Sequence, residues 1–430
     1  MGNFPKKVAK NILGAKIQKP QPFLVYLVMR GVTAFAFSLI ITYELVYHTT
    51  VLGLNPIQLV TLGVILETVQ FLFEIPTGMV ADLYSRRLSV LIGIVLTGLG
   101  FLAEGVMATL PAAWVAQLLW GLGFTFYSGA AEAWIGGEVD EQMAQQAYLR
   151  GAQIRQIMSL CGVAVGAFIV TYGLQWPIII GAVIYLGLAI LLVLMMTEVG
   201  FSPHLEEGEP SLWHKMISPI KEGVIQLKIR PVLAIIMGVG IVIGLSLGGF
   251  DRLNAAHILE NFNFPEFGSF SPVAWFSIIS GITAILSFLG AEIVRRYLKT
   301  NDNKQIANIL FWLYGGMIVF TLIFALNRWF YLAIASFCIS QSFRNTGRPL
   351  LIIWISQNTP SAIRATTISM YWQSNAFGNI VGSPIIGWIG SAFSIKAAMT
   401  AVGVIYSAVL PLIYLGGHQK YAEDLDPQGK

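Results

Sequence analysis

Long apolar segments alternate with short polar ones along nearly the whole chain. A helix needs about 20 mostly apolar residues to cross the hydrocarbon core of a bilayer, which is about 30 Å thick. The apolar segments have this length, so the pattern predicts an all-α membrane protein with twelve transmembrane helices. Their expected bounds are 23–48, 56–81, 88–109, 112–136, 150–171, 175–196, 231–252, 271–292, 304–326, 329–355, 365–390 and 395–416.

These helices fall into two groups of six, separated by a polar stretch. We therefore expect two pseudo-symmetric six-helix bundles joined by a linker. Within the linker, apolar side chains recur at helical spacing from Leu212 to Ile229, which favours a helix on the membrane surface over a site for a protein partner. The expected segments are an N-terminal arm at 1–22, bundles at 23–196 and 231–416, the linker at 197–230 and a tail at 417–430.

A weak internal repeat supports two related halves. Three features recur at an offset of 220 residues, between the fourth and fifth helices of each half: Trp134-Ile135 with Trp354-Ile355, Gln153 with Gln373, and Gly162 with Gly382. Two homologous six-helix halves with a solute site between them are a common plan among transporters.

Composition agrees with a bilayer environment. Apolar residues make up 56% of the chain and charged residues only 11%, whereas an ordinary soluble domain carries about 25% charged residues. The net charge of +4 is spread over short loops, which argues against a nucleic-acid partner. Cys161 and Cys338 lie inside apolar runs and offer neither a disulfide framework nor metal-binding spacing. The expected partners are the lipid bilayer and a small-molecule substrate, and we expect a monomer.

The distribution of lysine and arginine predicts the orientation. With both termini in the cytoplasm, 19 of the 26 basic residues lie in cytoplasmic segments and only three, Arg252, Arg328 and Lys396, in outer loops. Cytoplasmic loops of membrane proteins carry such an excess. Five lysines precede the first apolar run without a cleavage site, which indicates an uncleaved cytoplasmic arm. We expect an integral protein of a bacterial-type plasma membrane.

Polar side chains form stripes along four of the predicted helices. On the second helix, Glu67, Gln70, Glu74 and Gly78 lie on one continuous face. Ionisable groups in membrane helices usually face an interior path or a partner, so four stripes together predict a polar cavity. The other three stripes are Thr125, Ser128 and Glu132; Gln341, Arg344 and Arg348; and Asn375, Asn379 and Ser383.

Glu67 is the first candidate for a proton carrier. It lies about eleven residues from the outer end of its helix, near the midplane, and its own half has no basic residue at that depth. A carboxyl group taken out of water retains a proton more readily, which favours this role over that of a hydrogen-bonded structural carboxyl. Arg344 is near mid-depth in the other half, where it would hold an anionic substrate or pair with Glu67.

Counting depth along the helices also predicts two ion pairs. Glu74 and Arg30 lie at similar depths, as do Glu132 and Arg155 on consecutive antiparallel helices. Buried ion pairs often serve only to fix packing, so a structural and a functional role are equally supported for both pairs.

Three acidic residues, Glu44, Glu104 and Asp251, lie near the outer ends of their helices, and we expect them to reach water. Several aromatic side chains are candidates to line a cavity for lipophilic ligands, although aromatic residues in membrane helices more often pack. The candidates are Trp120, Tyr127, Phe343 and Trp372.

The loop after the second helix carries a motif, with Gly78, then Asp82 four residues later, then Arg86 and Arg87. This pattern resembles the loop signature of the major facilitator superfamily. Ser85 stands where the family usually has a second glycine, so the backbone of the turn is expected to differ. The resemblance implies a conformational latch, a set of contacts that holds the two halves together on the cytoplasmic side in the outward-open state. The alternative is that the two arginines only anchor the topology.

Three further runs, 73–77, 128–134 and 360–369, look like drug-efflux-type members of that superfamily, so the resemblance covers essentially the whole chain. It implies alternating access and, together with the acidic stripe, favours proton-coupled export of small amphipathic compounds. The alternatives are uptake of a polar or anionic solute bound by Arg30, Arg344 and Arg348, lipid translocation, and a receptor that has lost transport.

The sequence does not suggest an enzyme. Gly244, Ser246 and Gly248 match the hydrolase pattern G-x-S-x-G, but that pattern requires a strand-turn-helix context and here lies inside an apolar helix. Gly240, Gly244 and Gly248 instead predict close contact with a neighbouring helix. No nucleotide-binding loop or metal-ligand motif is present, so we expect no cofactor and a proton as the coupling ion.

Overall fold

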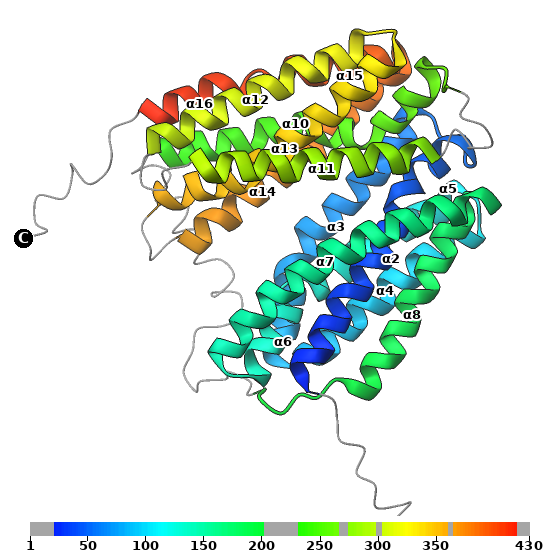
Figure 1. Ribbon diagram of the computed structural model, residues 1–430, viewed down its shortest axis with the longest axis vertical. Coiled ribbons are helices and arrows are strands. Elements are labelled where there is room, and N and C mark those ends of the chain that lie inside the picture. Colours follow the sequence, from blue (N-terminus) through cyan, green and yellow to red (C-terminus); the bar gives the residue numbers. More distant parts are fainter. Residues whose placement is uncertain (1–20, 202–230, 266–273, 298–302, 360–363, 419–430) are drawn as a thin grey trace, which may run out of the picture.

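The computed structural model describes residues 21–201, 231–265, 274–297, 303–359 and 364–418, and these residues are almost entirely helical. They form two bundles (Figure 1). The first bundle contains α2 (Pro22–Thr50), α3 (Pro56–Leu83), α4 (Arg86–Val106), α5 (Leu110–Tyr127), α6 (Ala130–Glu138), α7 (Glu141–Ile169), the short η1 (Val170–Tyr172) and α8 (Gln175–Met195). The second contains α10 (Pro231–Asn261), α11 (Ala274–Tyr297), α12 (Asn303–Leu326), α13 (Phe330–Gln357), α14 (Arg364–Ala392), α15 (Ile395–Tyr406) and α16 (Val409–His418).

Each of the twelve expected spans corresponds to one helix or to a broken pair of helices. Nine stretches within the described residues are long and apolar enough to cross a membrane. The remaining spans contain α5, α13 and α14, which carry the polar side chains predicted to face a cavity. The predicted surface helix from Leu212 to Ile229 lies outside the described residues.

Two expected helices are interrupted. The span predicted at 112–136 ends as α5 at Tyr127 and restarts as α6, because Gly129 has a φ of 76°, a conformation that glycine adopts at little cost. The last span divides into α15 and α16 around Ser407. Pro411, early in α16, lacks the backbone N–H that a continuous helix would bond to residue 407.

Two other helices are longer than predicted. The helix α7 begins at Glu141, nine residues before the predicted start at 150, and Asp140 caps it by accepting a hydrogen bond from the backbone N–H of Met143 at 2.8 Å. This first part is polar, so hydropathy alone does not reveal it. The helix α10 continues to Asn261 instead of ending at 252. Arg252 therefore lies in a helix, and its prediction as an outer-loop residue was wrong.

Glycines bring α10 and α14 into close contact, as the sequence predicts. A Cβ atom added to Gly244 would lie 2.0 Å from the backbone oxygen of Asn375, and one added to Gly378 would lie 2.2 Å from the backbone oxygen of Ile241. Backbone atoms cannot move away as the end of a flexible side chain can, so the two helices depend on these glycines for their separation.

We expect Gly244→Ala to lower the free energy of unfolding by about 1–3 kcal/mol, the usual cost of overpacking. The measurement is thermal unfolding of the purified protein in detergent. Gly281→Ala on α11 is the matched control, because no atom lies within 4 Å of its added methyl group. Equal melting temperatures for the two variants would contradict the close packing of α10 and α14.

The two bundles meet at the end of the molecule where α2 ends and α3 begins, which we call the closed end. The Tyr43 hydroxyl of α2 hydrogen bonds to Ser277 of α11, and the backbone N–H of Ile57 donates to the Ser391 hydroxyl at 3.2 Å. Apolar packing accompanies these bonds, since Gly387 of α14 lies against Val60 of α3.

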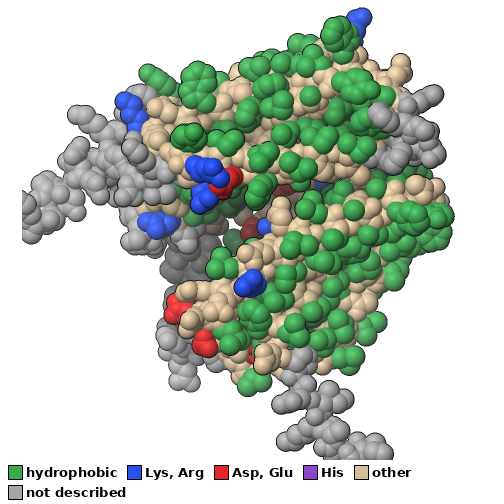
Figure 2. Space-filling view, in the orientation of Figure 1, with side chains coloured by type: hydrophobic (Ala, Val, Ile, Leu, Met, Phe, Trp, Pro, Cys, Tyr) green, Lys and Arg blue, Asp and Glu red, His purple; other side chains and the backbone are tan. Residues whose placement is uncertain are grey.

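Away from the closed end the bundles diverge (Figure 1). We call the opposite end, where α3 ends and α4 begins, the open end. Figure 2 shows the molecule hollowed between the two bundles, with charged side chains inside the hollow. Along α3 and α14 the contact extends from Gly387 beside Val60 to Gln373, whose amide nitrogen lies 3.3 Å from a carboxylate oxygen of Glu74.

Candidate functional site

A cavity of about 480 Å³ lies among the helices of the first bundle. It contains acidic, basic and aromatic side chains from α2, α3, α5 and α7, which suits an amphipathic ligand. Six of the side chains that the sequence predicts for the site line it: Arg30, Glu67, Gln70, Trp120, Tyr127 and Arg155.

Glu67 faces the second bundle. The side-chain amide of Asn379 on α14 lies beside its carboxyl group, and the charged groups that act on it are Arg252, Asp251 and Arg348, all from α10 and α13. The Asn379 oxygen accepts a hydrogen bond from the Ser383 hydroxyl at 2.6 Å, so the nitrogen of its amide is the group available to Glu67. The predicted stripes on α3 and α14 thus meet at this carboxyl.

Arg30 pairs with Glu132, at 3.1 Å between the guanidinium and the carboxylate. The predicted pairs, Arg30 with Glu74 and Glu132 with Arg155, were wrong. The break at Gly129 explains the error, because the depth of Glu132 cannot be counted along one continuous helix. Arg155 lines the cavity and forms no ion pair with any residue that the structure describes.

Arg344 is neutralised within its own bundle. Both of its terminal nitrogens bond to the Asp251 carboxylate on α10, one of them at 2.7 Å, and its side chain is only 8% exposed. The predicted pairing of Arg344 with Glu67 was therefore wrong. Asp251 reaches water as expected, with its side chain 42% exposed, and it also pairs with Arg344. Arg348, one turn further along α13, is exposed and has no ion-pair partner among the described residues.

Two further polar residues predicted for the site, Glu74 and Asn375, form hydrogen bonds with neighbouring helices of the second bundle. Glu74 is exposed and contacts Gln373 of α14. Asn375 donates to the backbone oxygen of Gly240 at 3.2 Å, which ties α14 to α10. Glu74 is thus the second acidic side chain of α3 that touches the second bundle.

The predicted aromatic residues divide into two pairs. Trp120 and Tyr127 line the cavity. Phe343 instead packs beside Phe320, with ring centroids 6.0 Å apart, and covers Gly316 of α12. Trp372 packs edge-on against Tyr371 and is not among the residues that line the cavity. Phe343 therefore packs in this conformation, whereas Trp372 is 43% exposed and lies outside the cavity.

The loop motif contacts the first bundle and the start of the linker. Arg86 donates to the backbone oxygen of Ala133 at 3.0 Å, and Arg87 to that of Val193 at 2.7 Å. Asp82 is exposed, and no atom lies within 4 Å of a methyl group placed on Gly78. Within the described residues, the motif makes no hydrogen bond to the second bundle when the open end is parted.

Ser85 caps α4 and links this loop to the start of the linker. Its φ of −173° is extended, so the glycine usual in the family is not needed here, and its hydroxyl accepts a hydrogen bond from Leu88 as the N-cap of α4. The same hydroxyl donates to the Glu198 carboxylate at 2.5 Å, and Glu198 also accepts from the backbone of Arg87 at 2.9 Å.

We expect Asp82→Asn to slow solute transport about five- to tenfold, a cost of about 1–1.4 kcal/mol, without lowering the melting temperature. Asp82 is exposed in the conformation described, so its contribution belongs to a state in which the open end closes. Transport and thermal unfolding are measured on the same preparation. A variant that loses stability but transports normally would contradict this role.

Sequence reasoning misses several residues that take part in these contacts. It places Asp251 and Arg252 at a helix end because the hydropathy-based bounds of α10 are too short, and it assigns Glu198 to the linker. Gln373 is noted only for the repeat. Residues two apart on a helix point in nearly opposite directions, so Gln373 lies away from the polar stripe that begins at Asn375. Its position in the sequence therefore did not indicate a place in the site.

Two six-span bundles that touch at one end and part at the other, with a charged cavity in the first of them, define a membrane transporter. The family model for the Major Facilitator Superfamily matches residues 23–343. The chain belongs to this superfamily; it is an integral membrane transporter and not an enzyme.

Similar proteins agree with this assignment. An uncharacterized MFS-type transporter, YxaM, of Bacillus subtilis (strain 168) is 22% identical over 363 residues, covering 83% of this chain and 86% of that protein. The solved nucleoside transporter NupG has a TM-score of 0.69 at 14% identity, covering 92% of this chain and 98% of the other. A bacterial homolog of the human lysosomal transporter Spinster, in an inward-facing and unoccupied conformation, has a TM-score of 0.70 at 14% identity, covering 94% and 98%.

Proposed function

We propose that the protein is a proton-coupled secondary transporter that exports small amphipathic compounds by alternating access. The observation that carries the proposal is the position of Glu67, whose carboxyl group lines the cavity of the first bundle and lies beside Asn379 of the second. A group that touches both bundles can change its proton affinity when they move. We expect no cofactor besides the proton, and a monomer.

The charge distribution supports an orientation. The excess of lysine and arginine favours a cytoplasmic position for the open end, with both termini on that side. The described conformation is then inward-open, and the closed end faces the outside of a bacterial-type plasma membrane. Export begins in this state, because the cavity is open to cytoplasmic solutes.

A second candidate substrate class is supported by the unpaired arginines. Arg30 and Arg344 are neutralised by carboxylates, whereas Arg155 and Arg348 have no ion pair in the described part of the chain. A guanidinium group without a partner is well suited to a carboxylate or phosphate. An amphipathic anion, exported or taken up, therefore competes with a lipophilic cation as the solute.

Equilibrium binding in detergent distinguishes the two classes. We expect an amphipathic aromatic carboxylate to bind, and Arg348→Gln to weaken it about tenfold, or about 1.4 kcal/mol. Arg348→Lys is the matched control and should retain most of the affinity because it keeps the charge. Tryptophan fluorescence reports both titrations. Binding of a lipophilic cationic dye, unchanged by Arg348→Gln, would exclude the anion and favour cation export.

A further inference from the structure

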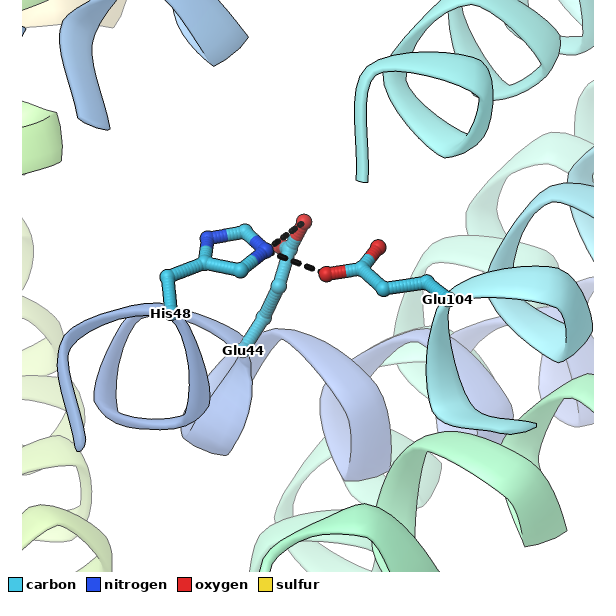
Figure 3. Close-up of side chains that lie close together, drawn as sticks. All are labelled: Glu44, His48 and Glu104. Atoms are coloured by element: carbon cyan, nitrogen blue, oxygen red, sulfur yellow. Dashed lines mark hydrogen bonds and ion pairs between the residues drawn. The ribbon is translucent and has the colours of Figure 1, made fainter. Parts of the chain in front are cut away.

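Three ionisable side chains lie together at the closed end, apart from the cavity (Figure 3). Glu44 and His48 come from α2, and Glu104 comes from α4; none has any exposed surface. The Nε2 atom of His48 hydrogen bonds to the Glu104 carboxylate and lies 4.0 Å from an oxygen of Glu44. The expectation that Glu44 and Glu104 reach water was therefore wrong. We call these three residues the buried cluster.

The buried cluster is connected to the second bundle by two hydrogen bonds. The Gln117 amide of α5 donates to Glu44 at 2.6 Å, and Arg252 of α10 donates to the Gln117 oxygen at 3.0 Å. The Arg252 side chain also packs against Gly63 of α3. The Gln117–Glu44 bond lies within the first bundle, whereas the Arg252–Gln117 bond crosses between the bundles at the closed end. The crossing bond therefore exists only while that end is shut.

Charge balance inside the buried cluster depends on Arg252. Two carboxylates without access to water require compensating positive charge or protons. The charged and titratable groups that face Glu44 and His48 are each other, Glu104 and Arg252, and Tyr47 bonds to the Glu104 backbone oxygen. A protonated His48 and Arg252 together balance the two carboxylates.

Each member of the buried cluster retains an unused polar atom. The second oxygens of Glu44 and Glu104 and the Nδ1 atom of His48 are buried without a hydrogen-bond partner in the described structure. When the bundles part at the closed end, Arg252 withdraws and one carboxylate loses its compensation. A proton on a carboxylate oxygen restores the balance, because the neutral form is favoured where a charge is unpaired.

We propose that Glu44, His48 and Glu104 form a second proton-binding site, which holds one more proton when the closed end is parted than when Arg252 seals it. This proposal rests on the alternating access in the proposed function, but not on Glu67 or on the solute. Reciprocity of linked equilibria requires that acid then favours the parted form. A proton from the side of the closed end therefore promotes opening toward that side.

The same ligand atoms would also suit a divalent cation, since they lie within 4.8 Å of one another. The direct hydrogen bond between His48 and Glu104 and the nearby positive charge of Arg252 favour a proton instead. A cation remains an outcome that the experiment separates.

The test measures the distance across the closed end against pH, without solute or gradient. Spin labels are attached to Val51→Cys and Phe393→Cys, two exposed positions on opposite bundles, in a full-length chain with Cys161→Ser and Cys338→Ser. All arms carry Glu67→Gln, so that Glu67 cannot titrate. We expect the ratio of parted to closed molecules to rise by up to about tenfold per unit of acidification between about pH 8 and 5, the limit for one proton.

In this background, Glu44→Gln should reduce the change to less than about twofold per pH unit. Arg252→Gln leaves the three residues of the buried cluster in place and should reduce the pH dependence in the same way. The proposal can therefore be tested even if Glu44→Gln fails to fold. Glu260→Gln, an exposed acid on α10, is the matched control and should keep the full dependence. Equal pH dependence in Glu44→Gln, Arg252→Gln and Glu260→Gln would overturn the proposal. So would a saturable shift on adding Zn²⁺ or Mn²⁺ at constant pH, which would assign the site to a metal.

Discussion

Glu67→Gln is expected to abolish gradient-driven solute accumulation while leaving solute exchange in place. Glutamine keeps the size of the side chain and can still contact Asn379, but it cannot release a proton. We expect accumulation driven by a pH gradient in reconstituted vesicles to fall at least about a hundredfold, equivalent to about 2.7 kcal/mol. Exchange of labelled for unlabelled solute, which needs no proton, should remain within about twofold.

The matched control is Glu74→Gln, on the same face of α3. Glu74 is exposed and contacts Gln373 through a bond of 3.3 Å, so its loss should cost much less accumulation. If Glu74→Gln abolished accumulation and Glu67→Gln did not, the proton carrier would be Glu74. Loss of both exchange and accumulation in Glu67→Gln would show that the carboxyl binds solute rather than protons.

Asp251→Asn is expected to destabilise the protein by about 1–2 kcal/mol, because it leaves the buried Arg344 guanidinium without its counter-charge. The Asp251 side chain is 42% exposed, so solvent screening lowers the cost below that of a fully buried pair. Arg344 is 8% exposed, and both of its terminal nitrogens bond to Asp251. The measurement is thermal unfolding in detergent. The double variant Asp251→Leu with Arg344→Met should recover part of the loss, since it leaves no buried charge without a partner.

Glu292→Gln provides the comparison for an exposed ion pair. Glu292 pairs with Arg295 and Arg296 at 2.8 Å, but the two arginine side chains are 74% and 71% exposed. Exposed pairs contribute little to stability because solvent screens them, so this variant should melt almost as the wild type does. An equal loss of stability in Asp251→Asn and Glu292→Gln would contradict the assignment of Asp251 as the counter-charge of the buried Arg344.

The helices were largely predictable because a bilayer imposes one length on every span. The errors lie where hydropathy carries no information. The polar first part of α7, from Glu141, does not look like a span, and the break at Gly129 depends on a single backbone angle. The continuation of α10 beyond Arg252 is not evident from hydropathy because charged and polar residues occupy that turn.

The sequence could predict which helix faces carry the polar side chains of the site, but not which of these side chains pair with one another. Helical spacing places Glu67 and Asn379 on stripes that do meet. Depth along a helix, however, says nothing about rotation around its axis, so it pairs Arg30 with Glu74 and not with Glu132. Tertiary contact also buries Glu44 and Glu104, which depth alone places near water.

The closed end and the cavity are linked through one side chain. Arg252 is among the charges nearest to Glu67, and it also reaches Glu44 through Gln117. Withdrawal of Arg252 when the closed end parts would alter the charge balance around Glu67 and in the buried cluster at the same time. We therefore expect Arg252→Gln to weaken the dependence of solute transport on outside pH.

The central claim, that solute movement is coupled to protons, is tested most directly by following both fluxes in the same vesicles. Wild-type protein is reconstituted into vesicles that are acidic inside, and labelled solute is added outside while a lumenal dye reports pH. We predict solute accumulation together with a rise in lumenal pH that requires solute, and neither in vesicles without protein. Proton coupling would be contradicted if solute entered at a rate that did not depend on the imposed pH gradient and caused no change in lumenal pH.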